Sequence, residues 1–236
     1  LSTDAGPLAA YRALPAAGRG PAVVVLQEIF GVNQAMRAVA DALAEEGYVA
    51  YVPDLFHRLE PRVELGYDEA GSQAAFALWK RFDLARGVAD AAQAVRAVAA
   101  RPETNGGVAL LGFCLGGQLA VKTAAATPVD AVLCFYGTRL GDCLAEIAAI
   151  EAPTLFHFGD ADPHVPPEVR EAVAAVAAQR PDMAVSVHPG AAHGFFNAYR
   201  QVSYHPEAHR RAWAQSLALL RDSLRAPQGA STAGVR

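Results

Sequence analysis

A cysteine set among closely spaced glycines is the residue in this chain best suited to chemistry. Residues 112–117 read Gly-Phe-Cys-Leu-Gly-Gly, after an apolar run at 108–111 and before a helix-like stretch at 118–126. This strand–turn–helix context is that of a nucleophile elbow, G-x-S-x-G, with cysteine in the place of serine. The residues two positions away must be small because strand and helix crowd together there. We therefore expect Cys114 to be a covalent nucleophile.

Two later loops carry groups that could activate the thiol. A free cysteine has a pKa of about 8.5, so Cys114 needs a base or a cation nearby. One apolar run ends in Gly-Asp-Ala-Asp at residues 159–162, and the loop after the next apolar run contains His193. The order nucleophile, acid, histidine is that of the α/β-hydrolase triad. We expect His193 to exchange a proton with the thiol and Asp162 to orient the imidazole, although spacing alone leaves Asp160 as an alternative acid.

The loop after residues 22–26 is expected to complete the site. Acyl transfer needs two backbone N–H groups directed at the developing oxyanion. One is that of Leu115, which follows the nucleophile, and we assign the other to Ile29. The adjacent Glu28 places a carboxylate at an otherwise apolar strand end, with an exposed loop carboxylate as the alternative interpretation.

The remaining reactive residue types have simpler interpretations. Three cysteines without a C-x-x-C pair predict neither a zinc site nor a disulfide framework. Cys134 and Cys143 are then expected to be small buried hydrophobic residues. The aromatic residues fit either the core or a pocket lining, and this set comprises Trp79, Tyr136, Phe195, Phe196 and Tyr199.

Short apolar runs alternate with helical segments and are expected to position these groups. Runs buried on both faces and separated by helices predict an α/β fold, a mostly parallel doubly wound sheet with helices on both faces. We expect one α/β-hydrolase domain over residues 1–225 and a disordered tail over 226–236, which lacks apolar periodicity. The predicted strands are 22–26, 48–52, 108–113, 131–136, 154–158 and 185–188. The predicted helices are 34–47, two within 69–100 broken near 83–87, 117–126, 167–179 and 207–224.

Composition excludes several classes of protein. The chain has 236 residues, of which 53% are hydrophobic and 19% charged, as in a globular domain rather than a disordered one. A net charge of −4 without long basic runs argues against nucleic-acid binding. The apolar runs are too short to span a membrane, and no secretory signal pattern opens the sequence. A reactive thiol fits the reducing cytoplasm, where we expect the protein to act.

Six segments together carry a family resemblance. On them, the chain resembles the dienelactone hydrolase family from about residue 20 to about residue 222. The segments are Gln-Glu-Ile-Phe-Gly-Val-Asn at 27–33, Pro-Asp-Leu at 53–55, the stretch 78–88, the elbow at 112–117, Gly-x-x-Asp-x-x-Val-Pro at 159–166 and Gly-x-x-His-x-Phe at 190–195.

The resemblance implies a monomeric α/β hydrolase without a cofactor, which opens a small ester or enol-lactone in aromatic catabolism through an acyl-thiol intermediate. It makes Cys114, Asp162 and His193 the catalytic triad. It also makes Glu28 the carboxylate that pairs with the resting thiol and takes its proton when substrate arrives. Such a pairing would keep the cysteine neutral and protected from oxidation.

The chain departs from the family where the substrate's carboxylate is held. Two family arginines align with Ser72 and Asn197, which disfavours dienelactone itself because a bidentate guanidinium clamp is lost. Arg58 does match a family arginine, and Arg200 lies close to one missing site. The alternatives are a general carboxylesterase or thioesterase and a non-catalytic thiol sensor or ligand-binding protein on this fold. The candidate substrate-binding residues are Arg58, Trp79, Tyr136, Phe195 and Asn197.

Overall fold

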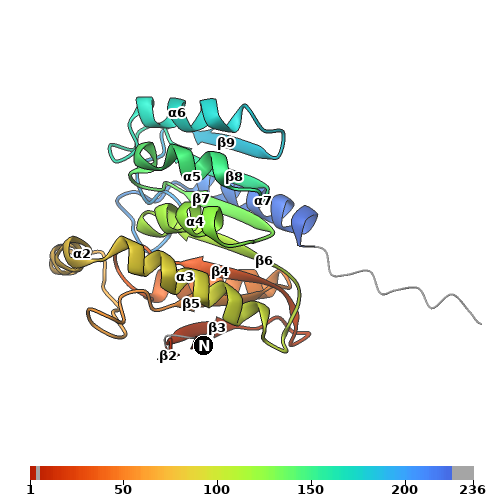
Figure 1. Ribbon diagram of the computed structural model, residues 1–236. Coiled ribbons are helices and arrows are strands. Elements are labelled where there is room, and N and C mark those ends of the chain that lie inside the picture. The colour runs from red at the N-terminus through yellow and green to blue at the C-terminus, as the bar shows by residue number, and fades with distance from the viewer. Residues whose placement is uncertain (4–5, 225–236) are drawn as a thin grey trace, which may run out of the picture.

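The computed structural model describes residues 1–3 and 6–224, so the predicted tail at 226–236 lies outside the described residues. Strands and helices alternate along the chain, as the sequence predicts (Figure 1). The strands are β1 (Ser2–Thr3), β2 (Gly6–Pro7), β3 (Ala10–Ala13), β4 (Gly20–Leu26), β5 (Val49–Pro53), β6 (Thr104–Phe113), β7 (Ala131–Phe135), β8 (Thr154–Gly159) and β9 (Met183–His188). The helices are α1 (Gln34–Glu45), α2 (Glu69–Arg81), α3 (Leu84–Ala99), α4 (Leu115–Ala126), the 3-10 turn η1 (Leu140–Cys143), α5 (Leu144–Ala149), α6 (Pro167–Ala177) and α7 (Pro206–Ser223).

A seven-stranded sheet forms the centre of the molecule, in the order β3-β5-β4-β6-β7-β8-β9. Every neighbouring pair is parallel except β3 and β5, which are antiparallel. The predicted α/β class with a mostly parallel sheet is therefore confirmed. The edge strand β3 was not predicted, and β1 and β2 pair separately from this sheet.

Alternating residues of each central strand pack against helices on opposite faces. In β4, Val24 and Leu26 join the core beneath α3 and α4, whereas Val23 and Val25 join the core beneath α1 and α7. The helices α3, α4, α5 and α6 cover one face of the sheet, and α7 lies behind it (Figure 1). The strands are apolar on both faces because both faces are covered.

The predicted break within residues 69–100 is confirmed between α2 and α3. The Asp83 side chain accepts a hydrogen bond of 3.1 Å from the Arg86 N–H and caps the start of α3. A new helix can therefore begin there at a different angle. Within residues 1–3 and 6–224, no helix is long and apolar enough to cross a membrane.

The register of the sheet brings distant loops to one edge. Leu26 lies opposite Gly112, Phe113 opposite Phe135, and Phe135 opposite His157. The loops that follow these parallel strands consequently leave at the carboxyl edge, where open α/β sheets place their ligand sites.

Candidate active site

Cys114 lies at a strained turn between β6 and α4. Its backbone angles are φ 55° and ψ −115°, which side chains rarely adopt. A Cβ on Gly112 would stand 2.0 Å from the Gly116 carbonyl oxygen, and a Cβ on Gly116 would stand 2.1 Å from that of Leu26. Both glycines are thus required by the close approach of strand and helix, as the elbow motif predicts. The Cys114 N–H donates to the Phe135 carbonyl at 3.0 Å, which fixes the turn to β7.

His193 and Asp162 lie beside this cysteine. Asp162 is buried, and its Oδ2 lies 2.8 Å from Nδ1 of His193. Its other oxygen accepts a hydrogen bond of 2.8 Å from the His164 N–H. Asp160 instead accepts from the Gly190 N–H at 2.6 Å. The carboxylate that contacts the imidazole is therefore that of Asp162.

The surroundings of His193 favour its protonated form. Burial lowers its pKa, but the charge of Cys114 and the hydrogen bonds to Asp162 and Cys114 outweigh this and raise the pKa to about 10. Because Asp162 occupies Nδ1, Nε2 is the nitrogen left for the cysteine. This arrangement can hold a thiolate next to an imidazolium, the reactive form of a catalytic cysteine.

Two backbone N–H groups next to Cys114 are free to bind an oxyanion. Those of Ile29 and Leu115 find no acceptor within the described residues, although both residues are buried. Leu115 is the first residue of α4, where the helix offers its N–H no partner. An unpaired buried donor is costly unless a ligand uses it.

Glu28 is buried and held by neutral hydrogen-bond donors. Its Oε2 accepts from the Tyr67 hydroxyl at 3.0 Å and from the Asn197 amide at 3.3 Å, and Oε1 accepts from the Tyr136 hydroxyl at 3.3 Å. The charge of Glu28 contributes to raising the pKa of Tyr67, after burial as the main cause. Cys114 acts electrostatically on His193, whereas the carboxylate of Glu28 bonds to these three side chains.

A cavity of about 220 Å³ lies over Cys114 and His193. One wall is apolar and aromatic, and Trp79 belongs to it. Two arginines, Arg139 and Arg200, line the cavity as well. Arg139 forms an ion pair with Asp142. For Arg200, no ion pair exists within residues 1–3 and 6–224. The complete lining is Glu28, Ile29, Phe30, Ser72, Phe76, Trp79, Cys114, Thr138, Arg139, His164, His193 and Arg200.

Several of the predicted substrate-binding residues lie outside this cavity. Arg58 forms a two-point ion pair with Asp90, at 2.7 and 2.8 Å, away from Cys114. Phe195 is fully buried and packs on Tyr136 with ring centroids 5.3 Å apart. Tyr136 and Asn197 bind Glu28 but do not line the cavity themselves.

Arg139 is the lining cation that the sequence interpretation missed. It follows β7 closely and has a left-handed backbone, φ 56°. Its place after a strand at the carboxyl edge was the available signal. Among the described residues, no group of three or more His, Cys, Asp or Glu side chains could hold a metal ion.

Known proteins resemble this chain over nearly its whole length. A model of the dienelactone hydrolase family matches residues 8–224. A carboxymethylenebutenolidase of Pseudomonas sp. (strain P51) is 37% identical over 225 residues, which cover 94% of each chain. A probable 2-oxo-3-(5-oxofuran-2-ylidene)propanoate lactonase of Bradyrhizobium sp. is 30% identical and covers 94% of this chain and 92% of its own. The crystal structure of a putative dienelactone hydrolase from Klebsiella pneumoniae superposes with a TM-score of 0.79 at 30% identity, covering 90% of this chain and 92% of the other.

Proposed function

Because the chain belongs to the dienelactone hydrolase family, we propose that it hydrolyses small esters or lactones through a covalent intermediate on Cys114. The observation that carries the proposal is the strained elbow, which presents the thiol to His193 beside two unpaired N–H groups. The nucleophile, the histidine and Ile29 line one cavity, and Asp162 supports the histidine from behind it.

The chemistry takes two steps. The Cys114 thiolate attacks the carbonyl carbon, a C–S bond forms, and the oxyanion is held by the N–H groups of Ile29 and Leu115. When the intermediate collapses, the C–O bond breaks and His193 donates its proton to the leaving oxygen. Water then attacks the thioester, His193 takes a proton from it, and the acid leaves as the thiolate is restored. Asp162 keeps the imidazole oriented throughout.

The cavity favours a small substrate with both an apolar part and a carboxylate. Phe30, Phe76 and Trp79 provide an apolar wall. Arg200 brings a charge that no acidic side chain neutralises among the described residues. We therefore propose that Arg200 binds a substrate carboxylate, in place of the arginines that Ser72 and Asn197 replace. We also propose that the protein is a monomer and that it acts in the cytoplasm, whose reducing conditions suit its three free cysteines.

Turnover of p-nitrophenyl acetate and of an enol-lactone by Cys114→Ala tests the nucleophile. We expect the variant to lose activity and the parent to show an acyl adduct at Cys114 by intact mass. Cys143→Ala is the matched control and should keep the adduct, because Cys143 is buried away from the cavity. Undiminished turnover by Cys114→Ala would refute the mechanism.

Two outcomes would favour the other functions. A thiol that reacts with iodoacetamide in a protein that hydrolyses no ester would indicate a sensor. Equal kcat/KM for paired esters with and without a carboxylate would indicate a general carboxylesterase.

A further inference from the structure

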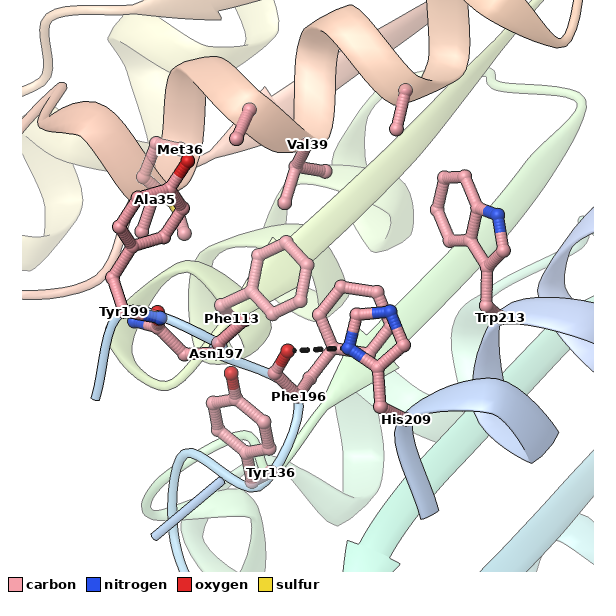
Figure 2. A pocket seen from close by; sticks show the side chains of 13 residues that line it. Ala35, Met36, Val39, Phe113, Tyr136, Phe196, Asn197, Tyr199, His209 and Trp213 are labelled. Carbon is pink, nitrogen blue, oxygen red and sulfur yellow. Dashed lines mark hydrogen bonds between the residues drawn. The ribbon is translucent and has the colours of Figure 1, made fainter. Parts of the chain in front are cut away.

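A second cavity lies between α1, the first half of α7 and residues 196–199 (Figure 2). Its volume is about 130 Å³, and it shares no lining residue with the cavity over Cys114. Its walls are mainly apolar and aromatic. They include Met36, Val39, Phe113, Phe196 and Trp213.

The partition between the two cavities is a set of hydrogen-bonded side chains. Tyr136 and Asn197 line the second cavity and donate to Glu28, which lines the first. A ligand in the second cavity would therefore lie behind Glu28 and out of reach of Cys114. The proposed hydrolysis makes no use of this space.

His209 gives the apolar cavity one hydrogen-bond acceptor. Its Nδ1 lies 2.7 Å from the Phe196 carbonyl oxygen, so the proton is on this nitrogen. Burial lowers the pKa of His209, the hydrogen bond to Phe196 partly offsets this, and the charge of Arg210 lowers the pKa further, which favours the neutral ring. Nε2 then carries a lone pair and has no partner within the described chain. Figure 2 shows this nitrogen on the edge of the ring turned toward α1.

Size and chemistry select the ligand. A cavity of about 150 Å³ lined by apolar side chains can hold one benzene ring. Aromatic walls favour such a ring through edge and face contacts. No Lys or Arg lines the cavity, so a carboxylate would lose its hydration without a counter-charge.

We propose that this cavity binds a neutral one-ring aromatic with a single hydroxyl group, a phenol, whose O–H donates to Nε2 of His209. Phe113, Phe196 and Trp213 enclose the ring. The site is separate from the catalytic cavity and does not require the proposed hydrolysis to be correct.

Tryptophan fluorescence measures this binding directly. The chain has two tryptophans, so Trp79→Phe leaves Trp213 as the only reporter. We expect phenol to change its emission saturably, toluene to bind about tenfold more weakly for lack of the hydroxyl, and benzoate not to bind. Prior alkylation of Cys114 with iodoacetamide should leave the affinity for phenol unchanged. Loss of binding after alkylation would place phenol in the catalytic cavity and overturn the proposal.

Two kinds of variant locate the ligand. Ala38→Phe and Ala42→Phe each fill the cavity from α1 and should weaken phenol binding about tenfold or more. Glu45→Phe adds the same side chain at an exposed position of α1 and should leave the affinity unchanged. This comparison is made by calorimetric titration. The filling variant used is one whose circular dichroism spectrum matches that of the parent.

His209→Phe retains a ring beside Phe196 but removes the acceptor. In this variant we expect phenol to bind no better than toluene. A preserved preference for phenol, or unchanged affinity in the filling variants, would show that the cavity is not the site.

Discussion

Asn197 donates a hydrogen bond of 3.3 Å to Oε2 of Glu28, across 169 positions of sequence. Both side chains are buried, and the other groups bonded to this carboxylate are the hydroxyls of Tyr67 and Tyr136. The contact joins the loop after β4 to the loop that carries His193. Position 197 is one of the two at which the family resemblance leads one to expect an arginine. In this chain a neutral amide takes that place beside the carboxylate.

Asn197→Asp should therefore destabilise the protein in a pH-dependent way. A second buried carboxylate beside Glu28 raises the pKa of the new group above its unfolded value. The penalty is consequently small near pH 4 and grows as the pH rises, to about 3 kcal/mol. Urea unfolding at several pH values measures it. Asn197→Ala, which removes the contact without adding charge, should lose less stability, with a much weaker dependence on pH.

Gly116→Ala should disrupt the elbow. The added Cβ would stand 2.1 Å from the Leu26 carbonyl oxygen, so α4 must move away from β4. We expect a loss of about 3 kcal/mol in unfolding free energy, as for other overpacked sites, and slower alkylation of Cys114. Gly141→Ala is the control, because its Cβ would meet Val169 at an ordinary 3.5 Å. Equal stability of the two variants would contradict this account of the turn.

The parts of the site that could be predicted are those encoded by short patterns. The glycines around Cys114 and the turn formers before Asp162 and His193 follow apolar runs, and parallel strands bring such loops to one edge. The strands with continuous apolar runs were identified for the same reason. By contrast, β6 begins at Thr104, four residues before its predicted start. Residues 104–107 are polar or glycine, so no apolar run marks this part of the strand in the sequence.

The missed features depend on contacts between distant residues. Tyr67 reaches Glu28 across 39 positions, and Arg58 turns to Asp90 across 32. No local pattern distinguishes an arginine that binds a neighbouring helix from one that lines a cavity. Packing also decides the position of Tyr136, which lies just past β7 with a φ of 38° rather than within the predicted strand.

Acid should destabilise the protein through a buried pair of histidines. Nδ1 of His157 lies 3.2 Å from Nε2 of His188, and Nε2 of His157 lies 3.1 Å from Oγ of Ser216. Burial, together with the charges of His188 and Arg211, lowers the pKa of His157 well below its ordinary value, and burial and nearby cations lower that of His188 to about 4. As the pH falls, these histidines are protonated in the unfolded chain before they are protonated in the folded protein. The contribution of the pair to folding stability is therefore fully present above about pH 6.5 and is lost as the pH falls toward 4.

For His157 alone the expected loss is on the order of 2 kcal/mol between pH 7 and pH 5. Urea unfolding across this range gives the slope. His157→Gln removes one of the two titrating groups and should reduce the slope by about half. Ser216→Ala keeps both histidines and should lower stability while it leaves the slope intact. A His157→Gln slope as steep as that of the parent would exclude this pair as the cause.

Arg200 and Arg58 should differ in their effect on substrate binding, although both are arginines near the carboxyl edge. Arg200 lines the cavity over Cys114, whereas Arg58 is held by Asp90 outside it. A lost charge-assisted contact to a substrate carboxylate costs about 1.5–3 kcal/mol, or roughly tenfold to a hundredfold in KM. We expect this rise for Arg200→Met with a carboxylated ester and little change with its neutral analogue. Arg58→Met should leave KM for both esters near the parent values, because its partner Asp90 does not touch the cavity. Steady-state kinetics of the two variants with the two esters measure these KM values. A KM increase confined to Arg58→Met would mean that the substrate carboxylate does not bind Arg200.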